Sequence, residues 1–176
     1  MHPRADSYLC KMKKPQANVS HGKPYPITWG MRRLIISVDK IILRMDYNKL
    51  TPEQERVITH KATEAPFTGE YDDFYEEGTF ICRRCNAPLF SSKSKFDAGC
   101  GWPSFDESLP NSLKRVPDPD GIRTEIECAN CGGHLGHEFI GEYLTQKNTR
   151  ECVNSLSIYF IPKGKKLPDI VDNRNK

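Results

Sequence analysis

The sequence predicts a β-rich domain with one or two small helices, held together by a structural zinc ion. Short segments that favour β-strands alternate with turn residues along most of the chain after residue 78. Two Cys-x-x-Cys pairs, at 82–85 and 128–131, supply four thiols in the pattern of a zinc site. A bound ion would help a chain with such short strands to hold a stable core.

The first predicted element is a short helix that begins at Pro52 and ends near His60. Thr51 suits the N-cap, proline suits the first helical position, and Gln54 completes a capping box. Residues 61–78 contain Pro, Gly and an acidic run, and they predict a loop that connects the helix to the strands.

Six short strands are predicted beyond this loop. The last of them has the clearest alternation of side chains, which is typical of a strand with one buried face. Between the third and fourth, Asp118–Gly121 has the Asp-Pro-Asp-Gly sequence of a turn. The predicted strands are Thr79–Cys82, Pro88–Ser91, Leu113–Val116, Ile122–Glu127, His134–Phe139 and Val153–Phe160.

Charge is distributed unevenly along the chain. Residues 1–44 carry nine Lys or Arg and two acidic residues, whereas residues 45–176 carry 17 Lys or Arg and 21 Asp or Glu. We predict a basic, unstructured N-terminal extension over 1–44, a folded domain over 45–165 and a C-terminal tail over 166–176. The mildly acidic domain argues against a nucleic-acid partner.

The basic extension allows more than one interpretation. Its apolar segment, 34–43, contains Asp39 and Lys40 and is too short to span a membrane, so we expect no membrane partner. A basic, acid-poor leader could be an organelle transit peptide, and Met45 could be the true start of translation. We favour a tail that the domain does not need. With no obvious export signal, the expected location is the cytoplasm.

Each Cys-x-x-Cys pair can form a tight turn, called a knuckle, that presents two thiolates to one ion. The two knuckles together can supply the four thiolates of a tetrahedral zinc site. Asn86–Pro88 follows the first pair and Gly132–Gly133 the second, and these residue types suit sharp turns. Two disulfides are the alternative, and they would need an oxidising compartment. A closed shell has no open position for a substrate, so the predicted zinc is structural. Its predicted ligands are Cys82, Cys85, Cys128 and Cys131.

Three cysteines, at positions 10, 100 and 152, lie outside the predicted metal site. On a strand, Arg150, Cys152 and Asn154 would project from one face, and a guanidinium lowers the pKa of a neighbouring thiol. Cys152 is therefore either a nucleophile or an inert strand cysteine, and the arginine favours the nucleophile. Cys100 lies between two glycines in an accessible loop, which suits thiol–disulfide exchange but also an ordinary turn.

Aromatic and imidazole side chains accompany these thiols. Trp102, which precedes a proline in the same glycine-rich loop as Cys100, could form a pocket wall or lie in the core. His134 and His137 follow the second knuckle and could bind a second metal, exchange protons or be structural. Two histidines near a reactive thiol favour proton transfer, because imidazole titrates near neutral pH.

Taken together, these motifs resemble the methionine sulfoxide reductase B family. The resemblance covers residues 47–163 in the expected order, and it includes the two Cys pairs. The other motifs that carry it are Lys49–Gln54, Thr63–Gly69, Cys-Gly-Trp-Pro-Ser-Phe at 100–105, Gly-His-Leu-Gly-His at 133–137 and Arg-Glu-Cys-Val-Asn-Ser at 150–155.

The resemblance implies two antiparallel β-sheets with a zinc held by four cysteines, and reduction of protein-bound methionine-R-sulfoxide as the activity. Cys152 would attack the sulfoxide sulfur, become a sulfenic acid and release methionine. Cys100 would condense with the sulfenic acid to form a disulfide, which thioredoxin would reduce. The implied partners are oxidised proteins and thioredoxin, and we expect a monomer that repairs oxidative damage.

Supporting roles also follow from the resemblance. Trp102 would contact the terminal methyl group of the substrate, and Arg150 would stabilise the thiolate. The sulfoxide oxygen would be bound or protonated by His137, with His134 and Asn154. A sulfoxide oxygen leaves readily only when it is protonated, so an acid near the thiolate is also required on chemical grounds.

The chain departs from the family pattern at two positions. Many members have His or an aromatic residue where this chain has Glu151, whose carboxylate should point away from the site. Some members have an acidic residue near Gly141, and here Glu138 and Glu142 are the candidates to replace it. A non-catalytic zinc module that binds a protein partner is the alternative function, and such a module would have no need for two spare thiols.

Overall fold

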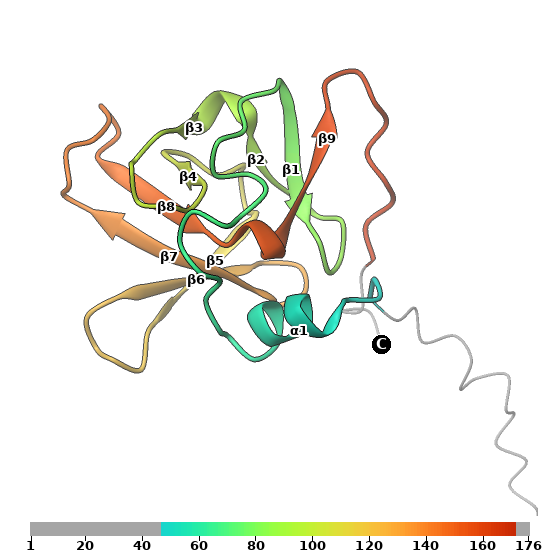
Figure 1. The fold of residues 1–176 in the computed structure, drawn as a ribbon, viewed down its shortest axis with the longest axis horizontal. Coiled ribbons are helices and arrows are strands. Elements are labelled where there is room, and N and C mark those ends of the chain that lie inside the picture. Colours follow the sequence, from blue (N-terminus) through green and yellow to red (C-terminus); the bar gives the residue numbers. More distant parts are fainter. Residues whose placement is uncertain (1–46, 172–176) are drawn as a thin grey trace, which may run out of the picture. The chain divides into compact units, whose positions relative to one another are not determined.

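The computed structural model describes residues 47–171, and Figure 1 shows its fold. The predicted extension 1–44 and the last residues of the predicted tail lie outside this range. The described chain is mainly β, with two antiparallel sheets, one α-helix and two short 3₁₀ helices, which confirms the predicted fold class. Within residues 47–171, no helix is long and apolar enough to cross a membrane.

The described residues form nine strands, and all neighbouring strands are antiparallel. In spatial order, the larger sheet consists of β3 (Lys95–Phe96), β4 (Ser104–Phe105), β8 (Thr149–Val153), β7 (His134–Ile140), β6 (Thr124–Cys128) and β5 (Leu113–Pro117). The smaller sheet consists of β2 (Pro88–Ser91), β1 (Gly78–Cys82) and β9 (Ile158–Pro162).

Helix α1 (Pro52–Ile58) confirms the predicted helix and its capping box. The Gln54 amide donates to the Thr51 hydroxyl over 3.3 Å, and the Thr51 amide donates to the Gln54 side chain over 3.0 Å. Two backbone amides at the helix start, which have no partner within the helix, are thereby satisfied. At the other end, Val57 and Ile58 are buried and anchor the helix.

The predicted strand Val153–Phe160 is wrong, because the chain turns in its middle. Val153 ends β8, a 3₁₀ helix occupies Ser155–Ser157, and β9 begins at Ile158 in the other sheet. The cause lies far away in the sequence. The Glu64 carboxylate accepts from the backbone amides of residues 155 and 156 over 2.6 and 3.0 Å. These amides are therefore not available to pair with a neighbouring strand. This turn carries the chain from one sheet to the other.

The other strand predictions are confirmed, with one shifted start. Four strands agree with the predicted ranges to within one residue at each end. The fifth, β6, begins at Thr124 rather than Ile122, because the Asp120 carboxylate accepts from the amides of Ile122 and Arg123 and keeps them in the turn. Strands β3 and β4 were not predicted, since two residues each are too few to show a period.

Aromatic side chains fill the space between the two sheets. Phe90 and Phe105 stack with ring centroids 4.2 Å apart, and Phe80 meets Phe105 edge-on at 5.2 Å. Phe80 also contacts Phe160 from β9, so the cluster joins strands of both sheets. All but Phe160 are fully buried, and rings of this size contribute much of the hydrophobic stabilisation of a small domain.

The segment after β9 returns to the cysteine pairs. The Val171 amide donates to the Cys85 carbonyl, and the Asn130 side chain donates to the Val171 carbonyl, each over 2.9 Å. The Asn86 side chain donates to the Asp169 carbonyl over the same distance. Residues 169–171 therefore link the two pairs, although the predicted boundary at 165 stays a prediction.

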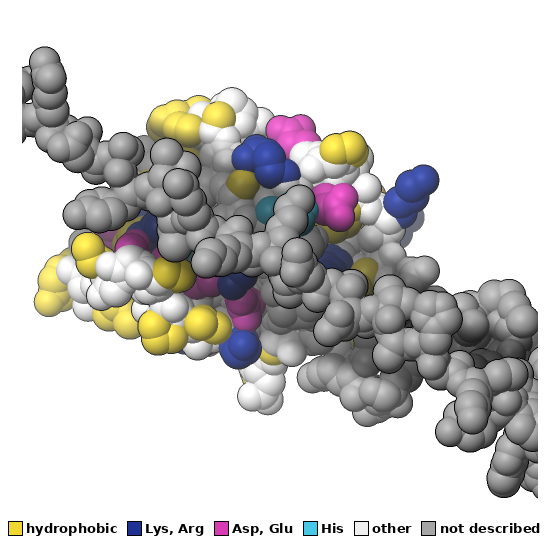
Figure 2. Space-filling model, turned by 90° about the horizontal axis from the view of Figure 1, so that it is seen from below, with side chains coloured by type: hydrophobic (Ala, Val, Ile, Leu, Met, Phe, Trp, Pro, Cys, Tyr) yellow, Lys and Arg dark blue, Asp and Glu magenta, His cyan; other side chains and the backbone are white. Residues whose placement is uncertain are grey.

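Acidic and basic side chains are interspersed on the surface. On the face drawn in Figure 2, blue Lys and Arg side chains lie beside magenta Asp and Glu side chains. Lys61, for example, lies 2.9 Å from both Glu125 and Glu127.

Glu151 lies on the face of β8 opposite to its neighbour Cys152, as strand alternation predicts. Its side chain is 1% exposed and accepts from the Arg115 guanidinium over 2.7 Å. Burial raises the pKa of this carboxyl to about 7, against an ordinary value of 4.5. A carboxyl whose pKa is raised by folding stabilises the native state fully at low pH and less as pH rises.

We expect the free energy of unfolding to fall by about 2–3 kcal/mol between pH 5 and pH 8 on account of Glu151. The folded state binds the proton more tightly than the unfolded chain, so this contribution is lost as pH rises through 7. Glu151→Gln keeps an acceptor for Arg115, and urea titrations should show that its free energy of unfolding changes less with pH. The control Glu77→Gln changes an exposed carboxylate and should keep the pH dependence of the wild type. A free energy of unfolding that falls as steeply with pH in Glu151→Gln as in the wild type would contradict the prediction.

Candidate active site and metal centre

The two Cys-x-x-Cys pairs form knuckles of the same shape. The Asn86 amide donates to the Cys82 carbonyl in the first, and the Gly132 amide donates to the Cys128 carbonyl in the second, both over 2.8 Å. Asn86 and Gly132 have φ of 64° and 68°. Glycine adopts this left-handed conformation freely and asparagine tolerates it, which explains the residue types after each pair.

The four knuckle sulfurs form one compact cluster. They lie within 4.8 Å of one another, and the contacts Cys82–Cys131 and Cys85–Cys128 are both 3.6 Å. A tetrahedral ion with metal–sulfur bonds of about 2.3 Å needs sulfurs about 3.8 Å apart. The cluster therefore fits a single metal ion that favours thiolate ligands, and its four members are the cysteines that the sequence indicated.

The two other described cysteines lie together at the larger sheet. Cys152 is in β8, between β4 and β7, and its neighbours across the two ladders are Ser104 and His137. Cys100 lies in the loop between β3 and β4, and its sulfur is 4.0 Å from that of Cys152. The short strand β4 places the two thiols together, because it fixes the end of the Cys100 loop against β8.

The two thiols influence each other's pKa across the 4.0 Å between their sulfurs. Contact with Cys152 lowers the pKa of Cys100 to about 5, and Arg150, whose guanidinium nitrogen lies 3.6 Å from the Cys100 sulfur, acts in the same direction. The same contact raises the pKa of Cys152, as does burial, while Arg150 lowers it. The arginine is therefore placed to stabilise a thiolate at this pair.

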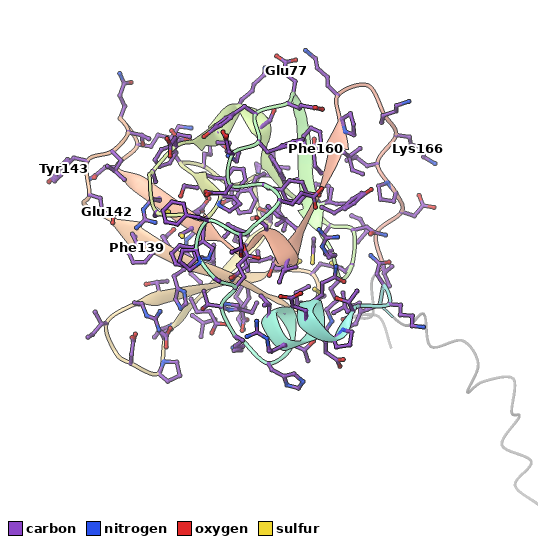
Figure 3. All side chains as sticks on the ribbon, in the orientation of Figure 1. Glu77, Phe139, Glu142, Tyr143, Phe160 and Lys166 are labelled. Atoms are coloured by element: carbon purple, nitrogen blue, oxygen red, sulfur yellow. The ribbon has the colours of Figure 1, made fainter. Side chains whose placement is uncertain are left out.

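Glu142 holds Arg150 in place. Its two carboxylate oxygens accept from Nε and Nη2 of the guanidinium over 2.7 and 2.9 Å, and Phe139 lies under the guanidinium at 4.3 Å from its ring centroid. Figure 3 shows Phe139 and Glu142 at the same end of β7. Of the two candidates to replace the acid near Gly141, Glu142 contacts Arg150, whereas Glu138 contacts Arg115.

We expect Glu142→Gln to slow alkylation of the thiol pair by iodoacetamide roughly threefold at pH 6–7, because a freed Arg150 would spend less time beside the sulfurs. Glu142 is partly exposed, which limits the effect. Glu77→Gln removes a carboxylate from a similar exposed pair with Lys163 and should leave the rate unchanged. Faster alkylation in Glu142→Gln would show that the charge of the carboxylate outweighs its hold on Arg150.

Glu64 connects three parts of the site, and no spacing in the sequence indicated it. Its carbonyl accepts from the Trp102 indole over 3.2 Å, which fixes the ring. Its amide donates to the Asn154 side-chain oxygen over 3.0 Å, and the Asn154 amide group donates to the Leu135 carbonyl over 3.0 Å. Asn154 is therefore engaged mainly with backbone groups, and it ties the loop 61–78 to β8 and β7.

Each histidine of the Gly-His-Leu-Gly-His motif is paired with a carboxylate. His134 is 2% exposed, and its Nδ1 lies 2.7 Å from Glu125. His137 Nε2 lies 2.6 Å from Asp118, in the turn between β5 and β6. The two rings meet edge-on with centroids 5.6 Å apart, so both histidines lie at one site.

A small pocket of about 120 Å³ opens beside Cys152. Its wall contains four of the residues predicted for catalysis or substrate binding. Thr63, Arg123 and Phe139 also line it and were not predicted, because they come from three separate segments without a common motif. The predicted residues in its wall are Trp102, His137, Cys152 and Asn154, whereas Cys100, His134 and Arg150 do not line it.

Comparison with known proteins gives a consistent result. The SelR domain profile matches residues 50–162. Peptide methionine sulfoxide reductase B5 of Arabidopsis thaliana is 59% identical over 114 residues, which cover 64% of this chain and 82% of that protein. The B5 protein of Oryza sativa subsp. japonica is 56% identical over 114 residues, covering 64% and 84%.

The matched region contains the whole site. It includes the helix, both knuckles, the two paired thiols and every residue that lines the pocket beside Cys152. The predicted resemblance, which extended over residues 47–163, is thereby confirmed. This chain belongs to the SelR domain family, the peptide methionine sulfoxide reductases of type B, and is an oxidoreductase.

Proposed function

We propose that this chain reduces protein-bound methionine-R-sulfoxide to methionine, with Cys152 as the nucleophile and Cys100 as the resolving cysteine. The observation that carries the proposal is the 4.0 Å separation of the two sulfurs beside a pocket lined by Trp102 and His137. A binding module would gain nothing from two free thiols at this distance. The alternative of a non-catalytic zinc module is therefore disfavoured.

The reductive step transfers one oxygen atom. The sulfoxide S–O bond breaks, the methionine sulfur gains two electrons and the Cys152 sulfur loses two. A Cys152 thiolate, the sulfoxide and one proton give methionine and a Cys152 sulfenic acid. The proton is needed because an unprotonated sulfoxide oxygen leaves poorly, and His137 is the acid that lies closest across the ladder from Cys152.

The second step forms a disulfide. The Cys100 thiol attacks the sulfenic acid, an S–S bond forms and water leaves with the oxygen. Glycines on both sides of Cys100, with φ of 63° and 86°, give its loop a backbone that only glycine adopts readily. We propose thioredoxin as the dithiol that reduces the disulfide, in a reducing compartment such as the cytoplasm, and a monomer as the working unit.

Pocket geometry supports selectivity for one epimer. A chiral sulfoxide is distinguished when its oxygen, its methyl group and its chain contact three different surfaces. Trp102, held by Glu64, offers an apolar wall for the methyl group. His137 faces the oxygen, and the open side of the pocket accommodates the polypeptide.

We also propose that the metal of the four-cysteine cluster is zinc and that it is structural. Four thiolates in a tetrahedral arrangement are the donor set that zinc favours, and they leave no coordination position for a substrate. The ion would join the knuckle after β1 to the knuckle after β6, and therefore one sheet to the other.

The test is turnover of each epimer of a methionine sulfoxide peptide with dithiothreitol as the reductant. We expect methionine formation from the R epimer and at least about 100-fold less from the S epimer, because the wrong epimer exchanges its oxygen and methyl positions. The free amino acid sulfoxide provides a comparison for the contribution of the polypeptide. A protein that retains its metal and its fold but does not reduce the R epimer would refute the proposed function.

A further inference from the structure

Asp118 lies outside the motifs that resemble the family, and it contacts His137 of the pocket wall. It lies in the turn between β5 and β6, and its Oδ2 is 2.6 Å from Nε2 of His137. The side chains of both residues are 14% exposed, so the contact is largely shielded from water. Within residues 47–171, Nδ1 of His137 has no hydrogen-bond partner.

The carboxylate of Asp118 is not needed to form its own turn. Backbone groups close the turn, since the Asp118 amide donates to the Arg123 carbonyl over 3.0 Å and the Gly121 amide donates to the Asp118 carbonyl over 2.9 Å. Asp118 Oδ1 adds only a 3.3 Å contact with the Asp120 amide. Its shortest contact is the one with His137, and Arg123 supports it from 3.1 Å.

The hydrogen bond from His137 lowers the pKa of Asp118, so the carboxylate is ionised at neutral pH and can only accept. Nε2 of the imidazole must therefore carry a proton while the contact is formed. A hydrogen bond at one ring nitrogen determines which nitrogen is protonated and how the ring is oriented. Cys152 lies directly across the ladder, so the ring orientation affects the reacting sulfur.

We propose that Asp118 is a positioning residue for the reductive step, which holds the His137 ring in one orientation by accepting a hydrogen bond from its Nε2. The inference rests on the proposed function. As imidazolium, His137 gives its proton to the sulfoxide oxygen, so that thiolate, sulfoxide and imidazolium yield sulfenic acid, methionine and neutral imidazole. Charge and atoms balance without a further reactant. Asp118 remains ionised throughout and does not itself contact the substrate.

Other charged groups face His137, and the test must separate their effects from that of Asp118. They come from the loop after α1, from β6 and the turn before it, from β7 and from β8. They are Lys61, Arg123, Glu125, His134 and Cys152. None of them is altered by the substitutions below, and the matched control changes a second carboxylate on the same turn.

The experiment compares Asp118→Asn with Asp120→Asn in single-turnover reduction of the R-sulfoxide peptide over a range of pH. Asp120 pairs with Arg123 over 2.6 Å and makes no contact with His137 within the described residues. Asp118→Asn should lower the rate of methionine formation about tenfold, with half-saturation within about twofold. Asp120→Asn should leave both unchanged, and Asp118→Glu should recover part of the rate.

Imidazole ¹⁵N spectra supply a measurement that does not need activity. In the wild type, Nε2 of His137 should give the signal of a protonated ring nitrogen, and Asp118→Asn should lose it at neutral pH while its melting temperature is retained. If the Asp118→Asn rate profile and spectrum equal those of Asp120→Asn, the inference is wrong. If the wild type shows the signal but does not reduce the peptide, the proposed function fails and the contact with His137 stands.

Discussion

Replacing Cys152 with serine should lower R-sulfoxide reduction by about 1,000-fold or more, to the limit of detection. A serine hydroxyl does not ionise near neutral pH, and it cannot form the sulfenic acid that receives the oxygen atom. The fold should survive, because Cys152 contacts the metal site nowhere among the described residues. Melting temperature and metal content, measured on the same sample, establish that the variant is folded.

Cys100→Ser is the matched control, since it makes the same change at the other sulfur of the pair. It should still release one methionine per chain in a single turnover, because the oxygen acceptor is intact. It should lose turnover driven by thioredoxin, because no disulfide can form. Mass spectrometry after one turnover should find one added oxygen on Cys152. Sustained thioredoxin-driven turnover in Cys100→Ser would refute the resolving role.

The lowered pKa of Cys100 does not conflict with attack by Cys152. The two sulfurs lie 4.0 Å apart, and Arg150 lowers the pKa of both thiols. A substrate sulfur that enters the pocket approaches Cys152, because that residue, and not Cys100, lines the wall. Cys100 does not line the pocket but lies close to Cys152, so it can attack once the sulfenic acid has formed.

Short-range patterns predicted the parts of this structure that are local. The capping box of α1, the knuckles and most strands depend on residues within a few positions of one another, and all were found from the sequence. The cluster of four cysteines was also predictable, because two knuckles have few other uses. The orientation of Glu151 followed from strand alternation alone.

Contacts between distant segments explain what the sequence did not reveal. Glu64 breaks the predicted strand 153–160 by accepting from amides about 90 positions away, and such a contact leaves no periodic signal. Asp118 was recognised only as a turn residue and Arg123 only as part of a predicted strand, because nothing in either segment shows that it folds over His137. That Glu142 contacts Arg150 while Glu138 contacts Arg115 also depends on contacts between separate segments.

Removing the metal should lower the free energy of unfolding by about 5 kcal/mol or more, since structural zinc contributes on the order of 10 kcal/mol in small domains. The knuckle after β1 and the knuckle after β6 belong to different sheets, so an ion bound by both would close a long loop. Without it, four thiols are left packed together, and three of them are buried. The melting temperature should fall by roughly 10 °C or more on chelation.

Cys82→Ser should reproduce the effect of chelation. Cys100→Ser is the matched control, because it removes a thiol outside the four-cysteine cluster. Cys82 is 1% exposed and lies in the cluster, whereas Cys100 lies in a loop outside it. The expected result is a lower melting temperature and a lower metal content in Cys82→Ser alone. An equal loss in both variants would mean that the cluster does not stabilise the fold. Restored melting on addition of zinc to the chelated wild type, but not to Cys82→Ser, would identify the ion and its ligand together.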